Sequence, residues 1–326
     1  MTSRERFHLT MDYSKPDRLP YFEEGLRKDV LRIWRKQGLS SDLSEINCFK
    51  TDRFEQILPE IDPLPSYKNW PTKIAQLSNL EKRLNENDPG RLPRGWIKTC
   101  HKWDKNDTVV FLRVHRGFFQ ALGVYDWGRF NELMSLLIED PVFVNDYMEL
   151  YTEFIIRLSL NIVKKVRIDG IIFSEPIGGT EGPLISPAMY EEFVLRFYQK
   201  IIDTLQKSGI RIFIYRTYAN TRILLPLILK YGFNCLWACE TNAEAMNYLS
   251  IRKELGRDLR LIGGIDLDTL RKNKDAIRYE IDRIIPELVA DGGYIPLADG
   301  RVRSDVYLDN YIFYRKYLES TIERLN

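Results

Sequence analysis

The sequence predicts an α/β fold. Residues 1–326 are expected to form a single (β/α)8 TIM barrel domain, which includes an N-terminal elaboration. Seven short runs are apolar through their length, as expected for strands buried on both faces of a parallel sheet. From residue 170 onward, amphipathic helical stretches separate these runs, which gives repeated βα units. Nearly every run ends on a charged or strongly polar residue. This is typical of barrel enzymes, whose catalytic groups gather at the carboxyl ends of the strands.

The apolar runs give the expected strands in chain order. The first strand is expected over 19–23 and the helix after it over about 27–37, with Gly38 just past the helix end. The runs themselves, with the polar group that ends each one, cover residues 19–24, 109–116, 170–175, 211–216, 234–240, 259–266 and 293–301.

Residues 40–107 differ from the rest of the chain because they lack sustained periodicity and are rich in proline. A structureless loop of this length is uncommon in a compact domain, so small strands and turns are expected within it. We therefore predict an insertion within the barrel domain, and not an independent domain. Its prolines are Pro59, Pro63, Pro65, Pro71, Pro89 and Pro93.

Helices are predicted from periodicity and from start and stop signals. Ser186 followed by Pro187 predicts a helix start, because serine caps a helix and proline suits its first position. Thr241 and Glu244 form a capping box that opens a helix ending at Gly256. Apolar residues at helical spacing predict further helices over 127–139, 142–166, 274–289 and about 309–325.

Composition limits the classes of protein that the chain can belong to. Its formal net charge of +2 gives no electrostatic reason to expect nucleic-acid binding. The four scattered cysteines form no Cys-x-x-Cys pair, which favours a reducing compartment and gives no zinc signal. The N-terminus is charged, unlike a signal peptide, and no stretch approaches the roughly 18 apolar residues of a membrane span. We expect a cytoplasmic protein without membrane contact.

Two carboxylates at strand ends are the predicted catalytic groups. Glu175 follows an apolar run and precedes Pro176 and a glycine-rich loop, where it could also be a solvated loop carboxylate. Asp299 precedes Arg301 and Arg303, so one acid could transfer a proton while an arginine binds an anion. The alternative for this last cluster is an internal Asp–Arg salt bridge.

Further strand-end residues are predicted to bind the substrate. Arg216 could hold a carboxylate in a bidentate fork, while Asn220 could instead cap the next helix. Glu240 could bind substrate or pair with a neighbouring arginine, and Asp266 could act in catalysis or cap the helix after it. The predicted substrate-binding set is Arg216, Arg301, His115, Arg116, Glu240, Tyr218, Asn220, Asp266 and Glu23.

His115 belongs to this set because histidine titrates near neutral pH, although a lone histidine is more often structural. Cys235 and Cys239 lie within or at the end of a predicted strand, where buried apolar thiols are expected.

The order of several short motifs resembles that of the uroporphyrinogen decarboxylase superfamily, through most of the length of the chain. Each motif is weak alone, but together in this order and spacing they are specific. The segments that carry the resemblance are the N-terminal Thr-Ser-Arg-Glu-Arg-Phe and Lys-Pro-Asp-Arg-Leu-Pro, Gly182–Phe193, Leu224-Leu-Pro-Leu-Ile, Gly232-Phe-Asn, Leu261–Asp266 and Gly292-Gly-Tyr-Ile-Pro.

The resemblance implies a (β/α)8 barrel and one of two chemistries. One is cofactor-free decarboxylation of a tetrapyrrole. The other is methyl transfer involving a corrinoid protein, usually with zinc that activates a thiol or alcohol.

The sequence departs from the residue patterns of both groups of enzymes. Tyr21–Gly25 lacks the arginine-rich motif of the decarboxylases, and Asp299 stands where their late histidine is expected. The zinc methyltransferases have His-x-Cys where this chain has Arg216-Thr217, and a later Cys near Asp299 is also missing, so no metal site of that design is expected.

We therefore expect a lyase that decarboxylates a carboxylated small molecule, with a tetrapyrrole-like compound as one candidate, without a metal or other cofactor. Glu175 and Asp299 would act as catalytic groups, and arginines would hold the substrate carboxylates. The alternative is a methyltransferase-like enzyme without the usual zinc ligands that serves a corrinoid protein. A binding protein without activity is a third hypothesis, which the many acids and arginines at strand ends disfavour. The sequence leaves open the identity of the substrate and whether the protein forms a homodimer. It also leaves open whether the carboxylates at the strand ends bind a hard metal ion.

Overall fold

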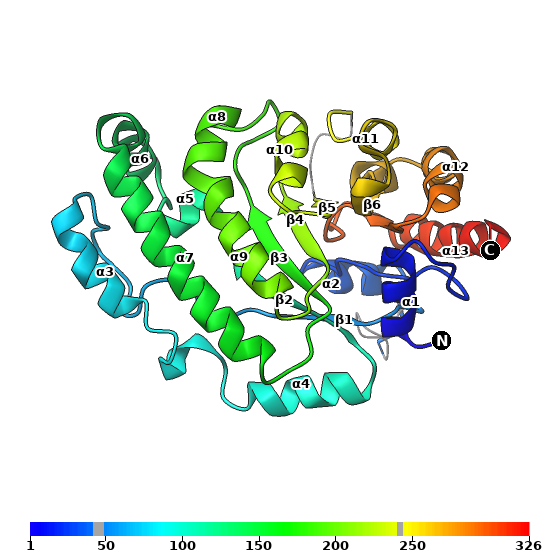
Figure 1. The fold of residues 1–326 in the computed structure, drawn as a ribbon. Helices are drawn as coiled ribbons and strands as arrows, with labels where there is room; N and C mark the ends of the chain where they lie inside the picture. Colours follow the sequence, from blue (N-terminus) through cyan, green and yellow to red (C-terminus); the bar gives the residue numbers. More distant parts are fainter. Residues whose placement is uncertain (42–48, 240–243, 326) are drawn as a thin grey trace. The chain divides into compact units, whose positions relative to one another are not determined.

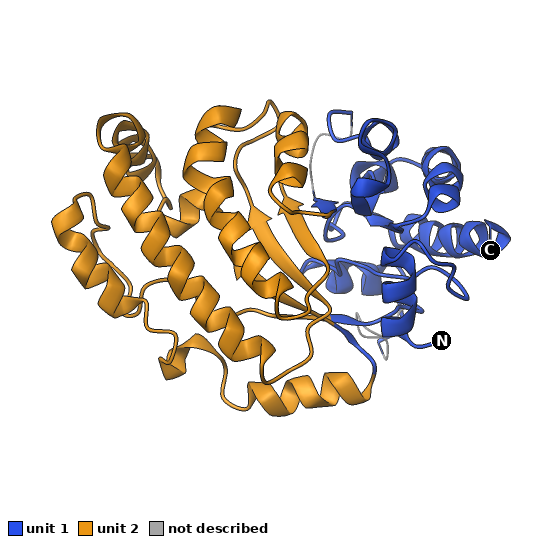
Figure 2. Ribbon diagram, viewed as in Figure 1, with its two compact units in different colours: residues 1–54, 107–109, 235–326 blue, residues 55–106, 110–234 orange. Residues whose placement is uncertain are grey.

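The structure, a computed structural model, describes residues 1–41, 49–239 and 244–325. Within these residues it contains seven β-strands, most of them followed by helices (Figure 1). The chain divides into two units (Figure 2). Unit 1 comprises residues 1–54, 107–109 and 235–326, and unit 2 comprises residues 55–106 and 110–234.

The sheet of unit 2 is parallel, and its strands are ordered as in the chain. β2 (Val109–His115) pairs with β3 (Gly170–Glu175), which in turn pairs with β4 (Phe213–Thr217). β1 (Phe54–Ile57) crosses the boundary between the units along the chain. The helices of this unit are α3 (Leu77–Arg83), α4 (Trp96–Lys105), α5 (Phe118–Ala121), α6 (Trp127–Glu139), α7 (Pro141–Val163), α8 (Pro187–Tyr190), α9 (Arg196–Gln206) and α10 (Leu225–Lys230), with short turns η1 (Ile74–Gln76), η2 (Pro89–Arg91), η3 (Glu191–Leu195) and η4 (Arg222–Leu224).

Unit 1 has the same plan. β5 (Cys235–Ala238), β6 (Arg260–Ile265) and β7 (Tyr294–Ala298) pair in parallel and in chain order. Its helical segments are α1 (Ser3–Met11), α2 (Val30–Lys36), α11 (Tyr248–Leu255), η5 (Gly256–Asp258), η6 (Leu267–Arg271), α12 (Lys274–Asp291) and α13 (Leu308–Leu325).

Local signals explain where the helices begin. The Asp126 side chain accepts a hydrogen bond from Arg129 N at the start of α6, and Asp140 caps α7 ahead of Pro141. Ser186 caps α8 as predicted. In unit 2, α7 and α9 pack side by side along the sheet (Figure 1), so their apolar stripes and the strands form one core. Among the described helices, none combines the length and the apolar character that crossing a membrane requires.

Two expectations about local structure were wrong. Residues 19–23 form no strand, because the backbone N–H of Tyr21 donates to the side chain of Asp52 and not to a neighbouring strand. The backbone pairs only slightly later, where Leu26 forms a parallel bridge with Val302. The other error concerns α11, which begins at an Asn247 cap. Thr241 of the predicted capping box lies outside the described residues.

The proline-rich stretch 40–107 contains more helix than expected. Alongside β1 it forms the helices α3 and α4, and most of it belongs to unit 2. Arg91 organises the part between them: its guanidinium donates to the backbone carbonyls of Glu60, Asp62, Arg83 and Asn85. This buried arginine therefore replaces the regular backbone pairing that the segment lacks.

Candidate functional site

The sheet of unit 2 has one face covered by helices, and ring contacts identify it. The ring of Phe173 lies 4.9 Å from that of Tyr198 in α9, so Phe173 points toward the helices. Side chains alternate along a strand, so Glu175 points the same way, whereas Ser174 points to the opposite face. Arg216 is the register partner of Ser174 and shares that opposite face.

A bulge in β2 separates two neighbouring polar residues. Arg113 is paired with Ile172, and His115 with Phe173, so the register shifts between them. In a regular strand, Arg113 and His115 would lie on the same face. The extra residue turns His115 toward the helices and leaves Arg113 on the face that also holds Arg216.

Positive charge accumulates at this end of β2 and β4. Burial lowers the pKa of Arg113, and the nearby charges of Arg116 and Arg216 lower it further. Arg113 is largely buried, and in the described part of the chain its Nε has no hydrogen-bond partner. Arg116 is neutralised by Asp62, and its Nη2 also lies 3.0 Å from the hydroxyl of Tyr125.

The remaining predicted residues on β4 lie close to this cluster. The guanidinium of Arg216 lies 5.5 Å from the ring centre of Tyr218, which is 41% exposed. The side chain of Asn220 accepts a hydrogen bond from Arg222 N at 3.2 Å, which is the capping role considered above. Arg113 was missed from the sequence, although a charged residue inside an otherwise apolar run was a usable signal.

Glu175 is fully buried in a polar network on the helix-facing side. Its Oε1 accepts a hydrogen bond from Phe118 N at 3.0 Å, and its Oε2 lies 2.5 Å from the hydroxyl of Tyr198. The hydroxyl of Tyr190 is 3.4 Å from Oε2 and 3.1 Å from the hydroxyl of Tyr215. Burial raises the pKa of Glu175 to about 7, although these hydrogen bonds oppose the shift.

His115 extends the network and constrains its protons. Its Nδ1 accepts a hydrogen bond from Gly117 N at 3.0 Å and lies 3.0 Å from the hydroxyl of Tyr198. Burial lowers the pKa of His115 to about 3, so the ring is neutral. If Glu175 is protonated, it can donate to Tyr198, which can donate to Nδ1. If Glu175 is ionised, Tyr198 donates to the carboxylate and Nδ1 keeps the hydrogen bond from Gly117 N, so the network accommodates both protonation states.

Asp299 occupies a similar environment in unit 1. It is 7% exposed, and its Oδ1 accepts a hydrogen bond from Leu267 N at 3.0 Å. Burial raises the pKa of Asp299 to about 7, and the charges of Asp266 and Asp268 act in the same direction. Asp266 caps η6 by accepting from Asp268 N at 2.9 Å and from the Thr269 hydroxyl at 3.2 Å. Glu175 and Asp299 belong to different units, and their action as a pair stays a prediction.

Other residues of the predicted set have structural partners or surface positions. Glu23 is buried and forms an ion pair with Arg315 at 2.5 Å, and it accepts a hydrogen bond from Tyr314 at 3.2 Å. Arg301 is exposed. Glu240 lies outside the described residues.

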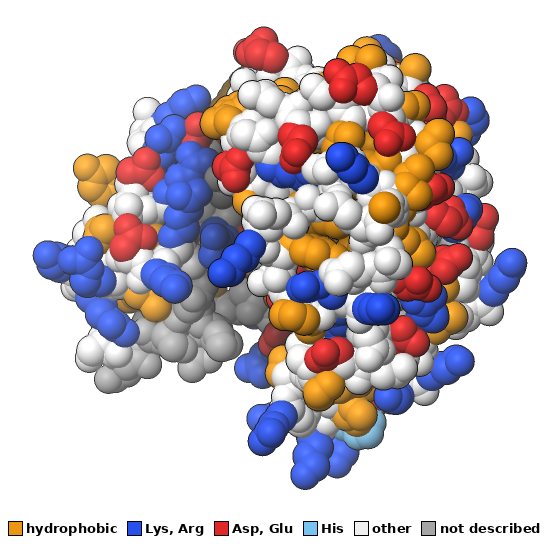
Figure 3. Space-filling model, turned by 90° about the vertical axis from the view of Figure 1, so that its left-hand side faces the viewer, with side chains coloured by type: hydrophobic (Ala, Val, Ile, Leu, Met, Phe, Trp, Pro, Cys, Tyr) orange, Lys and Arg blue, Asp and Glu red, His pale blue; other side chains and the backbone are white. Residues whose placement is uncertain are grey.

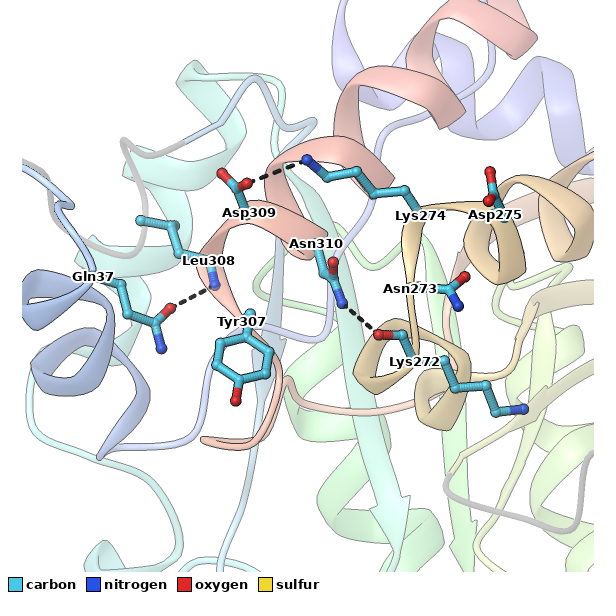
Figure 4. A pocket seen from close by; sticks show the side chains of 9 residues that line it. All are labelled: Gln37, Lys272, Asn273, Lys274, Asp275, Tyr307, Leu308, Asp309 and Asn310. Carbon is cyan, nitrogen blue, oxygen red and sulfur yellow. Dashed lines mark hydrogen bonds and ion pairs between the residues drawn. The ribbon is translucent and has the colours of Figure 1, made fainter.

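We also searched the described residues for groups of metal ligands and for surface pockets. Within residues 1–41, 49–239 and 244–325, no three His, Cys, Asp or Glu side chains converge as metal ligands would. A pocket of about 590 Å³ in unit 1 lies where α12 and α13 begin (Figure 4). Its Lys274 pairs with Asp309 at 3.2 Å, and Gln37 accepts from Leu308 N at 2.8 Å. On the face drawn in Figure 3, side chains of both charges are interspersed with hydrophobic ones.

Comparison with known proteins identifies a family and a fold. A family model described as uroporphyrinogen decarboxylase (URO-D) matches residues 126–296. None of the curated proteins matches the sequence. A solved methyltransferase from Methanosarcina mazei is similar with 13% sequence identity and a TM-score of 0.61, over 98% of this chain and 99% of that chain. The similarity extends along almost the whole chain, so the predicted TIM-barrel-like α/β fold is confirmed.

Two further solved structures are less similar. An α-amylase from Geobacillus thermoleovorans is similar over 72% of this chain and 62% of that one, with 14% identity and a TM-score of 0.37. A family 18 chitinase from Crocus vernus is similar over 76% of this chain and 79% of that one, with 10% identity and a TM-score of 0.34. These low scores support no functional argument.

Proposed function

Because the chain belongs to the uroporphyrinogen decarboxylase family, we propose that it is an enzyme that acts on a small carboxylate-bearing substrate held by the arginines of unit 2. The observation that carries this proposal is Arg113. It is a largely buried guanidinium close to two others, with a donor that has no partner in the described residues. A bound anion would supply the missing hydrogen bonds and offset the concentrated positive charge.

The arrangement suits recognition of a carboxylate. Arg113 and Arg216 lie on the same face of the sheet, and a guanidinium fork matches the two oxygens of a carboxylate. Arg116 already has Asp62 as a partner, so it contributes less net charge. Burial strengthens each of these interactions, because water screens them less than at the surface.

For the reaction, we favour methyl transfer with a corrinoid protein as partner over decarboxylation. The likeness of the fold to that of a solved methyltransferase, over almost the whole of both chains, supports this choice. A second support is that Glu175, the expected proton donor, points to the helix-covered face and away from the arginines. Guanidinium groups favour the anionic form of a bound acceptor, which is the form that attacks a methyl carbon.

Zinc does not fit this version of the site. The ligand positions that follow Tyr215 are Arg216 and Thr217, and neither offers the imidazole or thiolate that zinc prefers. We therefore derive no step through a metal. In this proposal the corrinoid partner supplies or accepts the methyl group, and the arginines hold and polarise the other reactant.

Decarboxylation is the second candidate, and Asp299 favours it. A buried carboxyl group whose pKa is raised to about 7 can hold a proton at neutral pH and donate it to carbon. The decarboxylase would release carbon dioxide, whereas the methyltransferase would not.

One experiment separates the two reactions. Purified protein is incubated with methylcobalamin and 3-mercaptopropionate, and in parallel with uroporphyrinogen. Loss of the cobalt–carbon absorbance together with S-methylated product supports methyl transfer. Carbon dioxide release from the porphyrinogen, without methyl transfer, would overturn it.

The anion site is tested separately by Arg113→Lys. The substitution keeps the charge but removes the planar fork, so affinity for 3-mercaptopropionate in calorimetry is expected to fall at least ~10-fold. Arg94→Lys, at an exposed arginine of the same unit, is the matched control and should bind normally. Equal affinity in both variants would remove Arg113 from the site.

A further inference from the structure

A second cavity, about 370 Å³ in volume, lies in unit 1 beside the start of α11, the turn after β6 and one face of α12. A smaller cavity of about 20 Å³ shares Asn247, Glu280 and Arg283 with it and also reaches Asp299. The two cavities therefore adjoin each other, and the smaller one, called the inner cavity below, has room for about one water-sized group. The outer cavity is lined mainly by Asn247, Asp266, Thr269, Tyr279, Glu280 and Arg283.

Two buried carboxyl groups line the inner cavity. Glu280 and Asp299 are each 7% exposed. Asp299 uses Oδ1 to accept from Leu267 N, and Glu280 uses Oε2 to pair with Arg283 at 2.8 Å. In the described part of the chain, no hydrogen bond reaches the second oxygen of either group. Neither oxygen is among the fully buried atoms that lack a partner, so each keeps accessible surface and is free to accept a hydrogen bond from a ligand in the cavity.

The surrounding charges leave the site acidic. Both carboxylate oxygens of Asp266 accept hydrogen bonds that cap η6. Arg303 forms an ion pair with Asp268 at 2.9 Å. Arg283 faces Glu280 and offsets one charge, and Glu244 and Lys272, which also line the outer cavity, add one charge of each sign. No cation lies against Asp299 at ion-pair distance among the described residues, and no three-carboxylate arrangement there suits a metal.

We propose that this cavity binds a small molecule through a primary ammonium group, which donates hydrogen bonds to Glu280 and Asp299. An ammonium group is compact and has three donors, so it matches the volume of the inner cavity and the two acceptors. A guanidinium is planar and larger than a water-sized space. The outer cavity would hold the body of the ligand.

The proposed ammonium site is distinct from the anion site. It is built from unit 1 alone and lies on the helix-facing side of β6 and β7. A Cβ at Gly264 would meet Tyr248 of α11, and Gly264 is the register partner of Leu297. Asp299 follows two residues later and so points the same way. Failure of either proposal leaves the other untouched.

The test measures the binding of n-butylamine to the protein. Calorimetry gives the affinity, and thermal unfolding gives the stabilisation of the protein by the ligand. Saturable stabilisation of the wild-type protein is expected. Tetramethylammonium has the same charge but no N–H donors, and it should give no saturable effect. An equal effect of both cations would overturn the proposal, as would no saturable binding of n-butylamine.

Variants assign the binding to the pocket. Glu280→Gln and Asp299→Asn are each expected to weaken binding at least ~10-fold, whereas Glu287→Gln, on the exposed side of α12, should bind as wild type. Ala276→Leu narrows the outer cavity without touching either carboxyl group, so it keeps the test decisive if a carboxyl variant fails to fold. Unchanged affinity in Ala276→Leu and Glu280→Gln would refute the site.

Discussion

Glu175→Gln should change how the stability of the protein depends on pH. Gln has nearly the shape of the protonated acid, so it can accept from Phe118 N and donate to the Tyr198 hydroxyl. Unlike Glu175, it cannot ionise. The substitution therefore fixes the network in its neutral form, with His115 still able to accept from Tyr198.

The magnitude follows from the pKa. The ordinary pKa of a glutamic acid is 4.5, and burial raises that of Glu175 to about 7. The folded protein therefore holds this proton more tightly than the unfolded chain. The resulting stabilisation is fully present below about pH 4.5, declines as the pH rises, and is lost above about pH 7. At about 1.4 kcal/mol per pKa unit, the interval corresponds to about 3 kcal/mol.

Urea unfolding of the wild-type protein and of Glu175→Gln from pH 4 to pH 8 measures this contribution. The wild-type free energy of unfolding, minus that of the variant, should fall by about 3 kcal/mol across the range. Asp299 adds its own decline to both proteins and cancels in the difference. Glu287→Gln, at an exposed position, controls for the removal of a surface carboxylate. Parallel curves for wild type and Glu175→Gln would refute the assigned protonation.

Three further variants test contacts that hold unit 1 together, each by urea unfolding. Asp52→Asn should destabilise by about 3 kcal/mol. Burial alone would raise the pKa of Asp52, but the hydrogen bonds from Arg18, Tyr21 N and Ser3 together with the charge of Arg18 lower it, so this stability is present above its unfolded pKa and is lost as the pH falls. Arg315→Met should cost about 3 kcal/mol by leaving Glu23 buried without its partner, and an unchanged midpoint would contradict that pairing. Gly264→Ala should cost about 2 kcal/mol, since its Cβ would lie 2.5 Å from the Tyr248 ring at a φ of +89°; wild-type stability would show that the ring can move.

Strand ends were predictable from the sequence, but the direction of their side chains was not. Glu175 ends β3 as the apolar run indicated, and Arg216 lies one residue before the end of β4. They nevertheless point to opposite faces, because side chains alternate and one residue of offset reverses the face. The bulge in β2 has the same effect on Arg113 and His115, and no local pattern in that apolar run marks it.

By itself the sequence determined the properties that depend on near neighbours. Apolar runs specified buried strands, and Ser186 with Pro187 specified a helix start, because burial and capping act over a few residues. Only the tertiary structure decided that Glu175 is buried among tyrosine side chains and that Arg113 lies near other arginines. These environments depend on register between strands far apart in the chain. Register is set by the packing of whole elements, which no short segment of the sequence contains.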